Sequence, residues 1–325
     1  MDKMEKHTEM PLVGIAVPVY NTDKYLAECL EHILAQTYQN WICYITDNAS
    51  TDRSYEIALE YEKKDSRFKV FRNESTVSAF KNWNITLGRF AGLDVKYVKY
   101  ECADDWMFPQ CIEKMVQLHE KDEQIGAVYA YRLEDKYVNC DGMDIYDGNV
   151  FDGKEIIRKS LLHGLYIYGG LGQALYKTEA LKQVDANLQV INENNIHCDV
   201  EMNDNVLRNS KAGFIHEVLT YYRRHEGQVL SFAEKTNTLL YGIERRMFLF
   251  LDIFPELQQP YRELRLEYAI FLNKCKRKKE SEILAWHVKH LERPITINEL
   301  KLAKKQMRKR FLREIRVNIV RLFTV

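Results

Sequence analysis

The chain has 325 residues, of which 46% are hydrophobic and 29% are charged, and its formal net charge is +0. This length suffices for one large α/β domain or for a domain of ordinary size with an extension, and the composition excludes a disordered or fibrous protein. Without net charge the chain has no general attraction for nucleic acid, so we expect no nucleic-acid partner.

The cysteines and the N-terminal residues bear on the compartment. Seven cysteines are scattered along the chain without a C-x-x-C pair, which argues against a disulfide framework and against a structural zinc site. The N-terminal stretch MDKMEKHTEMP is charged throughout, unlike a signal peptide. The sequence contains no run of about eighteen apolar residues, the length needed to span a bilayer. It therefore predicts a cytoplasmic protein.

The first part of the chain alternates apolar, strand-like runs with amphipathic segments. The runs LVGIAVPVYN, WICYIT, RFKVFRN, VKYVKYECA and IGAVYAY predict strands over 12–21, 41–46, 67–73, 95–103 and 125–131. The segments between them predict helices over 22–36, 53–65, 77–90 and 110–122. This alternation implies right-handed βαβ crossovers, so we predict an α/β, Rossmann-like domain with a mostly parallel sheet flanked by helices.

The pattern becomes less regular after residue 140. Residues 166–181 indicate a glycine-broken segment that runs into a helix, and no convincing strand pattern follows residue 236. We therefore predict two regions, an α/β domain over 1–235 and a helical C-terminal region over 236–325.

Three carboxylates fall at the ends of predicted strands. Asp47 follows the second strand, and Asp104 and Asp105 follow the fourth. The carboxyl ends of parallel strands meet at one edge of a sheet, where ligands bind. An adjacent pair of acids has three interpretations: a helix N-cap, a solvated loop, or a site for Mg²⁺ or Mn²⁺. For Asp47 alone, a cap or an Asx turn is at least as good an interpretation as a functional role.

The first predicted strand closes at the same edge in a turn of four residues, Pro18, Val19, Tyr20 and Asn21. Small residues follow Asp47 and leave room for a ligand to approach the backbone. A flat nucleobase fits between two such turns, while a diphosphate reaches toward Asp104 and Asp105. The sequence therefore predicts a nucleotide site at this edge.

Two stretches carry a resemblance to a known family. VGIAVPVYNTDKYLAECLEHILAQTYQNWICYITDNASTD and YVKYECADDWMFPQCIEKM resemble family 2 glycosyltransferases, which have the nucleotide-diphospho-sugar transferase (GT-A) fold. The resemblance covers about residues 12–231. It implies that the first turn and Asp47 hold the nucleobase, that Asp104 binds the ribose and diphosphate, and that Asp105 is the better match to the metal ligand.

The chain departs from the family pattern at several positions. The family's D-x-D-D has an acid where this chain has Cys102, and Asn48-Ala49 stands where Asp-Gly is common. The resemblance places Asn84 near the donor and assigns a basic donor contact to Lys81. The last two acids of the pattern remain, so the implied cation site loses one supporting carboxylate only.

Sugar transfer also needs a base, because the acceptor hydroxyl must lose its proton while the leaving diphosphate is stabilised. Asp199 matches the family's base best by its distance from the later segment GFIHEVLTYYRRH, and Glu201 and Asp204 are alternatives. An acidic helix start favoured by the macrodipole explains any one of these acids equally well.

The segment YYRRHEGQVLS resembles the family's Y-R-x-H motif. The resemblance implies that His225 closes over a metal-bound diphosphate and that Arg224 or Arg223 faces phosphate charge. A base across the sugar from the leaving group implies one in-line displacement with inversion. The expected cofactor is Mn²⁺ or Mg²⁺, and the expected donor is a nucleotide-diphospho-sugar, with a UDP-sugar as the first candidate.

Together these observations predict a metal-dependent, inverting glycosyltransferase that passes a sugar to a glycan or a lipid-linked acceptor in bacterial surface polysaccharide synthesis. A sugar nucleotidyltransferase of the same fold would carry a G-x-G-x-R loop after the first strand, which VPVYNTDKYL lacks. An alternative from another class is a catalytically silent nucleotide-sugar or glycan-binding module.

The C-terminal tail, residues 301–325, is strongly basic. It carries nine Lys or Arg and one acid, which gives +8 and leaves −8 on the rest of the chain. Apolar residues recur in it every four positions, at Met307, Phe311, Ile315, Ile319 and Phe323. Such a helix can lie on an anionic membrane, which would place the protein peripherally on the inner face of the plasma membrane. Packing on the catalytic domain or on a second subunit is an equal alternative.

Overall fold

The computed structural model of the protein describes residues 10–140, 143, 148–163, 167–193 and 197–225, and the isolated positions 254, 301 and 305. Of the described residues up to 225, all except Leu161–His163 belong to one compact unit. The predicted boundary at residue 235 and nearly all of the predicted helical region, including the apolar positions of the basic tail, lie outside the described residues and stay predictions.

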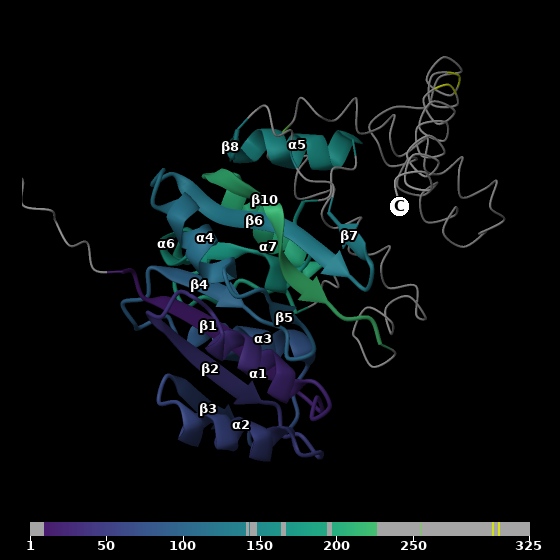
Figure 1. Ribbon diagram of the computed structural model, residues 1–325. Helices are drawn as coiled ribbons and strands as arrows, with labels where there is room; N and C mark the ends of the chain where they lie inside the picture. Colours follow the sequence, from purple (N-terminus) through teal and green to yellow (C-terminus); the bar gives the residue numbers. More distant parts are fainter. Residues whose placement is uncertain are drawn as a thin grey trace, which may run out of the picture. The chain divides into compact units, whose positions relative to one another are not determined.

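The N-terminal part of the sheet consists of the first four strands of the chain, which are all parallel (Figure 1). Its strands are β1 (Val13–Val19), β2 (Trp41–Asp47), β3 (Phe68–Arg72) and β4 (Tyr97–Tyr100). Strand β1 pairs in parallel with β2 on one side and β4 on the other, and β3 pairs in parallel with β2. The connections are α1 (Leu26–Leu34), α2 (Ser54–Lys64) and α3 (Ala79–Gly88). Each of these three helices therefore connects two parallel strands, as predicted.

The remaining strands complete a ten-stranded sheet with the main order β3-β2-β1-β4-β9-β6-β10-β5. They are β5 (Trp106–Met107), β6 (Ile125–Glu134), β7 (Tyr137–Asn139), β8 (Val150–Asp152), β9 (Leu175–Lys177) and β10 (Lys211–Tyr222). Strand β10 runs parallel to β6, whereas β9 is antiparallel to both β4 and β6. The main strands thus share one direction, and the prediction of a mostly parallel sheet is confirmed.

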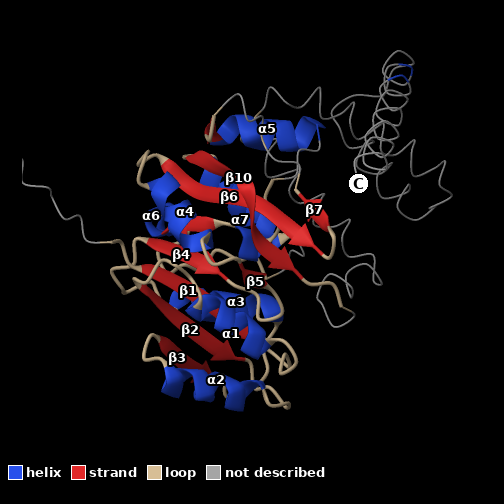
Figure 2. Cartoon of the chain, viewed as in Figure 1, coloured by secondary structure: helices blue, strands red, loops and turns tan. Residues whose placement is uncertain are grey.

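Helices lie against both parts of the sheet (Figure 2). Besides α1–α3 they are α4 (Cys111–His119), α5 (Gly153–His163), α6 (Thr178–Lys182) and α7 (Cys198–Leu207), with a short 3₁₀ helix, η2 (Leu171–Gln173). No described helix combines the length and the apolar character needed to cross a bilayer.

The core is built on the central strands. Along β1, Val13, Ile15, Ala16, Val17 and Val19 are all fully buried, so both faces of the strand are covered. This explains the continuous apolar run, which differs from the alternation of a half-exposed strand. Each of the valine and isoleucine side chains contributes about 1.5–3 kcal/mol on burial, and this core fixes the positions at which the strands end.

The structure adds strands that the sequence pattern did not predict. Strand β9 lies inside the segment 166–181, which was predicted only as a glycine-broken stretch leading into a helix, and the helix that follows it, α6, has five residues. Strand β10 occupies a region with no predicted strand, and the short β5 pairs with it in antiparallel fashion. These additions matter because β10 leads into the segment Arg223–His225.

Candidate active site

A cavity of about 1000 Å³ opens at the carboxyl ends of the main strands. Strands β1 and β4 reach it directly, and α7 and the end of β10 meet them there. Its lining includes Pro18–Tyr25, Asn48, Val77, Ala79, Phe80, Asn82, Trp83, Glu101–Asp105, Arg132, Gly169–Gln173, His197–Val200, Thr220–Tyr222, Arg224 and His225. The turn predicted to hold a nucleobase, Pro18–Asn21, is therefore part of the cavity wall.

The two adjacent acids follow strand β4, and the main chain after β10 holds them in place. The backbone N–H of Arg223 donates to Asp105 Oδ1 at 2.8 Å, and Arg223 Nε donates to the backbone oxygen of Asp104 at 3.0 Å. The same guanidinium reaches Glu28 on α1 at 2.5 Å. One arginine thus ties the β4 loop to the end of β10.

The interpretation of Asp105 as a helix N-cap is wrong. The next helix, α4, begins at Cys111, and its N-cap residue is Gln110. The buried carboxylate of Asp105 accepts its hydrogen bond from Arg223, which lies far away in the sequence. Both adjacent acids line the cavity instead.

Asp104 and His225 are in contact with each other in the cavity wall. Asp104 Oδ2 lies 2.9 Å from His225 Nε2, and both side chains are about one-fifth exposed. The ring of Tyr25, in the loop before α1, lies 4.9 Å from the imidazole ring. A carboxylate and an imidazole at this distance can bind one cation together, or one proton between them.

Burial alters the acids around this pair. It raises the pKa of Asp105 well above its usual value, and the neighbouring charge of Asp104 raises it further. Burial also raises the pKa of Glu101 to about 7, although Lys99 nearby acts in the opposite direction. Glu101 and Lys99 are almost completely buried, with Oε2 and Nζ 3.7 Å apart. Negative charge is therefore crowded at this edge, which is the condition that a bound cation relieves.

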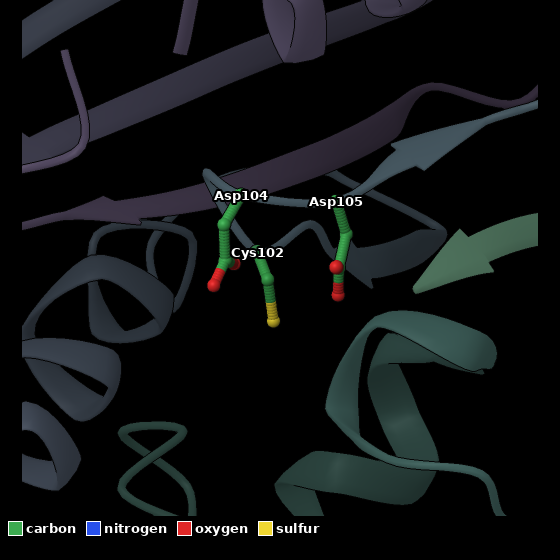
Figure 3. A group of neighbouring side chains, drawn as sticks. All are labelled: Cys102, Asp104 and Asp105. Atoms are coloured by element: carbon green, nitrogen blue, oxygen red, sulfur yellow. The ribbon is translucent and has the colours of Figure 1, made fainter. Parts of the chain in front are cut away.

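Three side chains of the β4 loop form a potential cation site (Figure 3). One donor atom each of Cys102, Asp104 and Asp105 lie within 4.8 Å of one another. Carboxylate oxygens are the ligands that Mn²⁺ and Mg²⁺ prefer, and the imidazole of His225 is already in contact with Asp104. The residues present therefore fit a divalent cation.

Of the three acids considered as base, only Asp199 lines the cavity. It lies in the first turn of α7, where its Oδ1 accepts the N–H of Val200 at 2.8 Å, and burial raises its pKa. Both oxygens of Glu201 accept from Asn192 Nδ2 at 3.0 Å.

Asp204, the other alternative, is fully buried on the same helix. Its Oδ1 accepts the hydroxyl of Tyr168 at 2.8 Å. Glu201 and Asp204 therefore have local structural partners, whereas Asp199 is placed to meet a ligand.

Four other predicted site residues are absent from the cavity lining: Asp47, Lys81, Asn84 and Arg223. Asp47 is fully buried behind the wall, where Oδ2 accepts from the backbone N–H of Ser50 at 3.1 Å and pairs with Arg72 Nε at 3.2 Å. Lys81 is exposed on α3.

The amide of Asn84 has a structural partner. Its Nδ2 donates to the backbone oxygen of Ile191 at 2.8 Å, and its Oδ1 accepts the backbone N–H of Ile191 at 2.9 Å. Both groups are buried. Asn84 thus fixes the loop before α7 to α3, and its neighbours Asn82 and Trp83 line the cavity instead.

Arg132 is a lining residue that the sequence reasoning missed. It is buried near the end of β6, donates to the backbone oxygen of Gly169, and lies 3.4 Å from Glu134. Arg224, which was predicted to face phosphate, donates to the same Glu134. The sequence did contain a signal for Arg132, because it is a charged residue directly after a predicted apolar strand. Asp47 was identified by the same signal.

The glycines of GGLGQALY also shape the wall. Gly169 and Gly170 have φ of +71° and +137°, a backbone region that favours glycine. A Cβ on Gly169 would lie 1.1 Å from the side-chain oxygen of Gln173. These glycines therefore let the chain turn tightly between α5 and η2, beside Arg132.

The comparisons with known proteins agree with this architecture. The family described as Glycosyl transferase family 2 matches residues 14–183. The glycosyltransferase GlyG of Streptococcus pneumoniae serotype 4 is 30% identical over 228 residues, which cover 67% of this chain and 73% of that protein. The match with GlyG is thus longer than the region that the family matches.

Two solved structures show the same fold. TarS of S. aureus, residues 1–349 in complex with UDP-GlcNAc, has a TM-score of 0.54 at 18% identity, covering 73% of this chain and 66% of that one. The mannosyltransferase PcManGT of Pyrobaculum calidifontis, in complex with GDP-Man and Mn²⁺, has a TM-score of 0.53 at 15% identity, covering 75% and 65%.

The fold is thus that of the GT-A glycosyltransferases. The family match covers more than half of the chain, so the chain belongs to glycosyl transferase family 2.

Proposed function

We propose that this protein transfers a sugar from a nucleotide-diphospho-sugar to an acceptor hydroxyl, with a divalent cation and with inversion at the anomeric carbon. One observation carries the proposal: the paired acids after β4, His225 after β10 and Asp199 at the start of α7 all line a single cavity. These residues come from three separate stretches of the chain, and a structural role for each one alone does not account for their convergence.

The nucleoside is expected at the ends of β1 and β2. The turn Pro18–Asn21 and the side of Trp83 offer flat surfaces in the cavity wall. Behind them, Oδ1 of Asp47 is buried and has no hydrogen-bond partner among the described residues. Because Asp47 is fully buried and does not line the cavity, a nucleobase N–H would reach this oxygen only after the wall residues in front of it move. A UDP-sugar is the first candidate donor, as TarS binds UDP-GlcNAc.

The diphosphate and cation are expected at Asp104, Asp105 and His225. When bound, the cation would stabilise negative charge on the leaving diphosphate. Asp104 presents its carboxylate to His225, while Asp105 is fixed by Arg223, so we assign Asp104 and His225 as a pair and Asp105 as the supporting acid. This assignment modifies the expectation that Asp105 is the main ligand.

Arg224 is expected to exchange partners when the donor binds. In the structure it donates to Glu134, but its side chain is about half exposed beside the cavity. A diphosphate carries more charge than one carboxylate and accepts charge-assisted hydrogen bonds from arginine. Glu134 would keep its second contact, with Arg132.

Asp199 is expected to accept the proton of the acceptor hydroxyl. Its carboxylate is desolvated by burial, which raises its pKa and makes it a stronger base than an exposed aspartate. A base on α7 and a leaving group at β4 suit a single displacement with inversion.

The acceptor is proposed to be a glycan or a lipid-linked saccharide of a bacterial surface polysaccharide. The resemblance to GlyG, a glycosyltransferase of a bacterium, supports this class. A lipid-linked acceptor would suit a protein on the inner face of the plasma membrane. The basic tail, whose apolar stripe the structure does not describe, would supply the attachment.

A thermal-shift screen tests donor binding directly. UDP-, GDP- and dTDP-sugars are added with Mn²⁺ or with chelator, because a ligand that binds only the native state raises the apparent melting temperature. We expect one nucleotide class to stabilise the protein with Mn²⁺ and much less with chelator, and Asp104→Asn to lose the metal-dependent part. No stabilisation by any nucleotide sugar would contradict the proposal. Binding without transfer or donor hydrolysis would instead favour the silent binding module.

A further inference from the structure

The departure from the family's acidic pattern lies inside the potential cation site. Where the resembling family has the first acid of D-x-D-D, this chain has Cys102. Its side chain projects from the β4 loop between those of Asp104 and Asp105 (Figure 3). Sγ and one oxygen of each acid lie within 4.8 Å of one another. The thiol of Cys102 therefore lies beside the two acids.

Each of these side chains keeps a donor atom for a ligand. Asp105 uses Oδ1 for the backbone of Arg223, and Asp104 uses Oδ2 for His225. Oδ2 of Asp105, Oδ1 of Asp104 and the thiol of Cys102, a free cysteine, take part in no hydrogen bond within the described ranges. Each of the three side chains thus keeps one atom that makes no hydrogen bond in the described part of the chain.

The chemistry of this donor set differs from that of an all-carboxylate site. Carboxylates are hard ligands that suit Mg²⁺ and Mn²⁺, whereas a thiolate is soft and selects thiophilic metals. Sulfur, carboxylate oxygen and imidazole nitrogen together are the donors that Zn²⁺ takes in proteins, usually four at a time. Cys102, Asp104 and Asp105 supply three such donors at one place, and the imidazole of His225 adjoins them through Asp104.

We propose that Cys102 is a metal ligand of this site and gives it a preference for thiophilic divalent cations, such as Co²⁺, Zn²⁺ and Cd²⁺, over Mg²⁺. The inference rests on the proposed function in one respect, because both place a cation on Asp104. On metal binding the thiol loses its proton to solvent and the sulfur lone pair forms the bond to the metal.

Absorption spectroscopy with Co²⁺ tests this ligand directly. A Co²⁺–thiolate bond produces a charge-transfer band in the near ultraviolet, so the signal reports sulfur ligation without any sugar transfer. The reduced, full-length protein is titrated with cobalt chloride. We expect the band in the wild type, and we expect its loss in Cys102→Ser.

Cys140→Ser is the matched control. Cys140 is also partly exposed, but its Sγ contacts the backbone oxygen of Ile167 at 3.4 Å and does not line the cavity. This variant should keep the band. Cys102→Asp restores the acid of the family pattern and serves if Cys102→Ser fails to fold. It should bind Mg²⁺ more tightly than the wild type and show no band.

Two results would overturn the inference: bound Co²⁺ without a thiolate band in the wild type, or a band that persists in Cys102→Ser or Cys102→Asp. Equilibrium dialysis measures how much Co²⁺ is bound in each case. If Mn²⁺-dependent donor binding persists while the band is absent, the proposed function stands and only the role of Cys102 fails. If no divalent cation binds at all, both fail.

Discussion

The two parts of the sheet differ in how they build the cavity. In the part from β1 to β4, the strands β1, β2 and β3 pair in sequence order, β4 returns to pair with β1, and each connection is a helix. In the part from β9 to β10, neighbours in the sheet are distant in sequence: β9 lies between β4 and β6, and β5 pairs with β10. The first part supplies the turn Pro18–Asn21 and the paired acids, and the second supplies His225, Arg132 and the wall around Asp199.

This difference explains what the sequence could and could not predict. An apolar run followed by an amphipathic helix is a local signal, so β1 to β4 and α1 to α4 were found with small shifts at their ends. Strand β9 has three residues, and only its partners on β4 and β6 make it a strand. Strand β5 has two residues and depends on β10 in the same way.

The candidate site shows the same limit at the level of single residues. Asp104 and Asp105 were found because they close a strand, and they line the cavity. The sequence did not indicate that the backbone N–H of Arg223 would hold Asp105. On α3 it did not indicate that Asn84 faces Ile191 while Asn82 faces the cavity. Orientation on a helix depends on packing partners that a short motif does not contain.

The largest expected effect concerns Asp199, the acid from the second part. In Asp199→Asn the side chain keeps its size but no longer accepts a proton, and removal of a general base typically costs 10²–10⁴-fold in rate. We expect a loss of about that size in turnover, with donor affinity retained. Turnover is measured as release of nucleoside diphosphate, and donor binding as the thermal shift.

Glu193→Gln is the control for this variant. Glu193 is an exposed carboxylate a few residues earlier that does not line the cavity. Its replacement should leave turnover unchanged. Full activity in Asp199→Asn would exclude Asp199 as the base.

The next effect concerns the junction between the two parts. Asn84→Ala removes both hydrogen bonds to Ile191 and leaves that buried backbone unsatisfied. We expect the free energy of unfolding to fall by about 1–3 kcal/mol, whereas Lys81→Ala, on the exposed side of the same helix, should change it little. Urea denaturation measures both. Equal free energies of unfolding in the two variants would show that the hydrogen bonds between Asn84 and Ile191 do not stabilise the fold.

A pH effect is expected where α4 meets β9. His119 is buried, its Nε2 lies 2.9 Å from the backbone oxygen of Leu175, and burial lowers its pKa to about 4. An unfolded histidine has a pKa near 6.5, so between pH 6.5 and 4 the unfolded chain binds more protons than the folded one. Stability contributed by neutral His119 is therefore lost as pH falls through this window.

The slope of this loss approaches about 1.4 kcal/mol per pH unit. Urea denaturation at pH 7, 6 and 5 measures it in the wild type and in His119→Gln. The variant cannot take up the proton, so its stability should fall less over this range. Identical pH profiles would contradict the assignment.

The smallest effect is expected at the surface of the first part. Lys64 on α2 and Glu31 on α1 form an ion pair at 2.5 Å, and both side chains are about half exposed. Solvent screens such pairs, so Lys64→Ala should cost about 0.2–1 kcal/mol. A loss of several kcal/mol in urea denaturation would mean that the packing of α1 on α2 depends on this pair.

The most direct test of the account is the anomeric configuration of the sugar that the enzyme releases. Donor hydrolysis with water as acceptor needs no knowledge of the natural acceptor, and ¹H NMR identifies the anomer formed first, before mutarotation. If the leaving group lies at the β4 acids and the base is Asp199 on the opposite side, an α-linked donor yields the β-anomer first. Initial release of the α-anomer would contradict an attack from the face that Asp199 occupies.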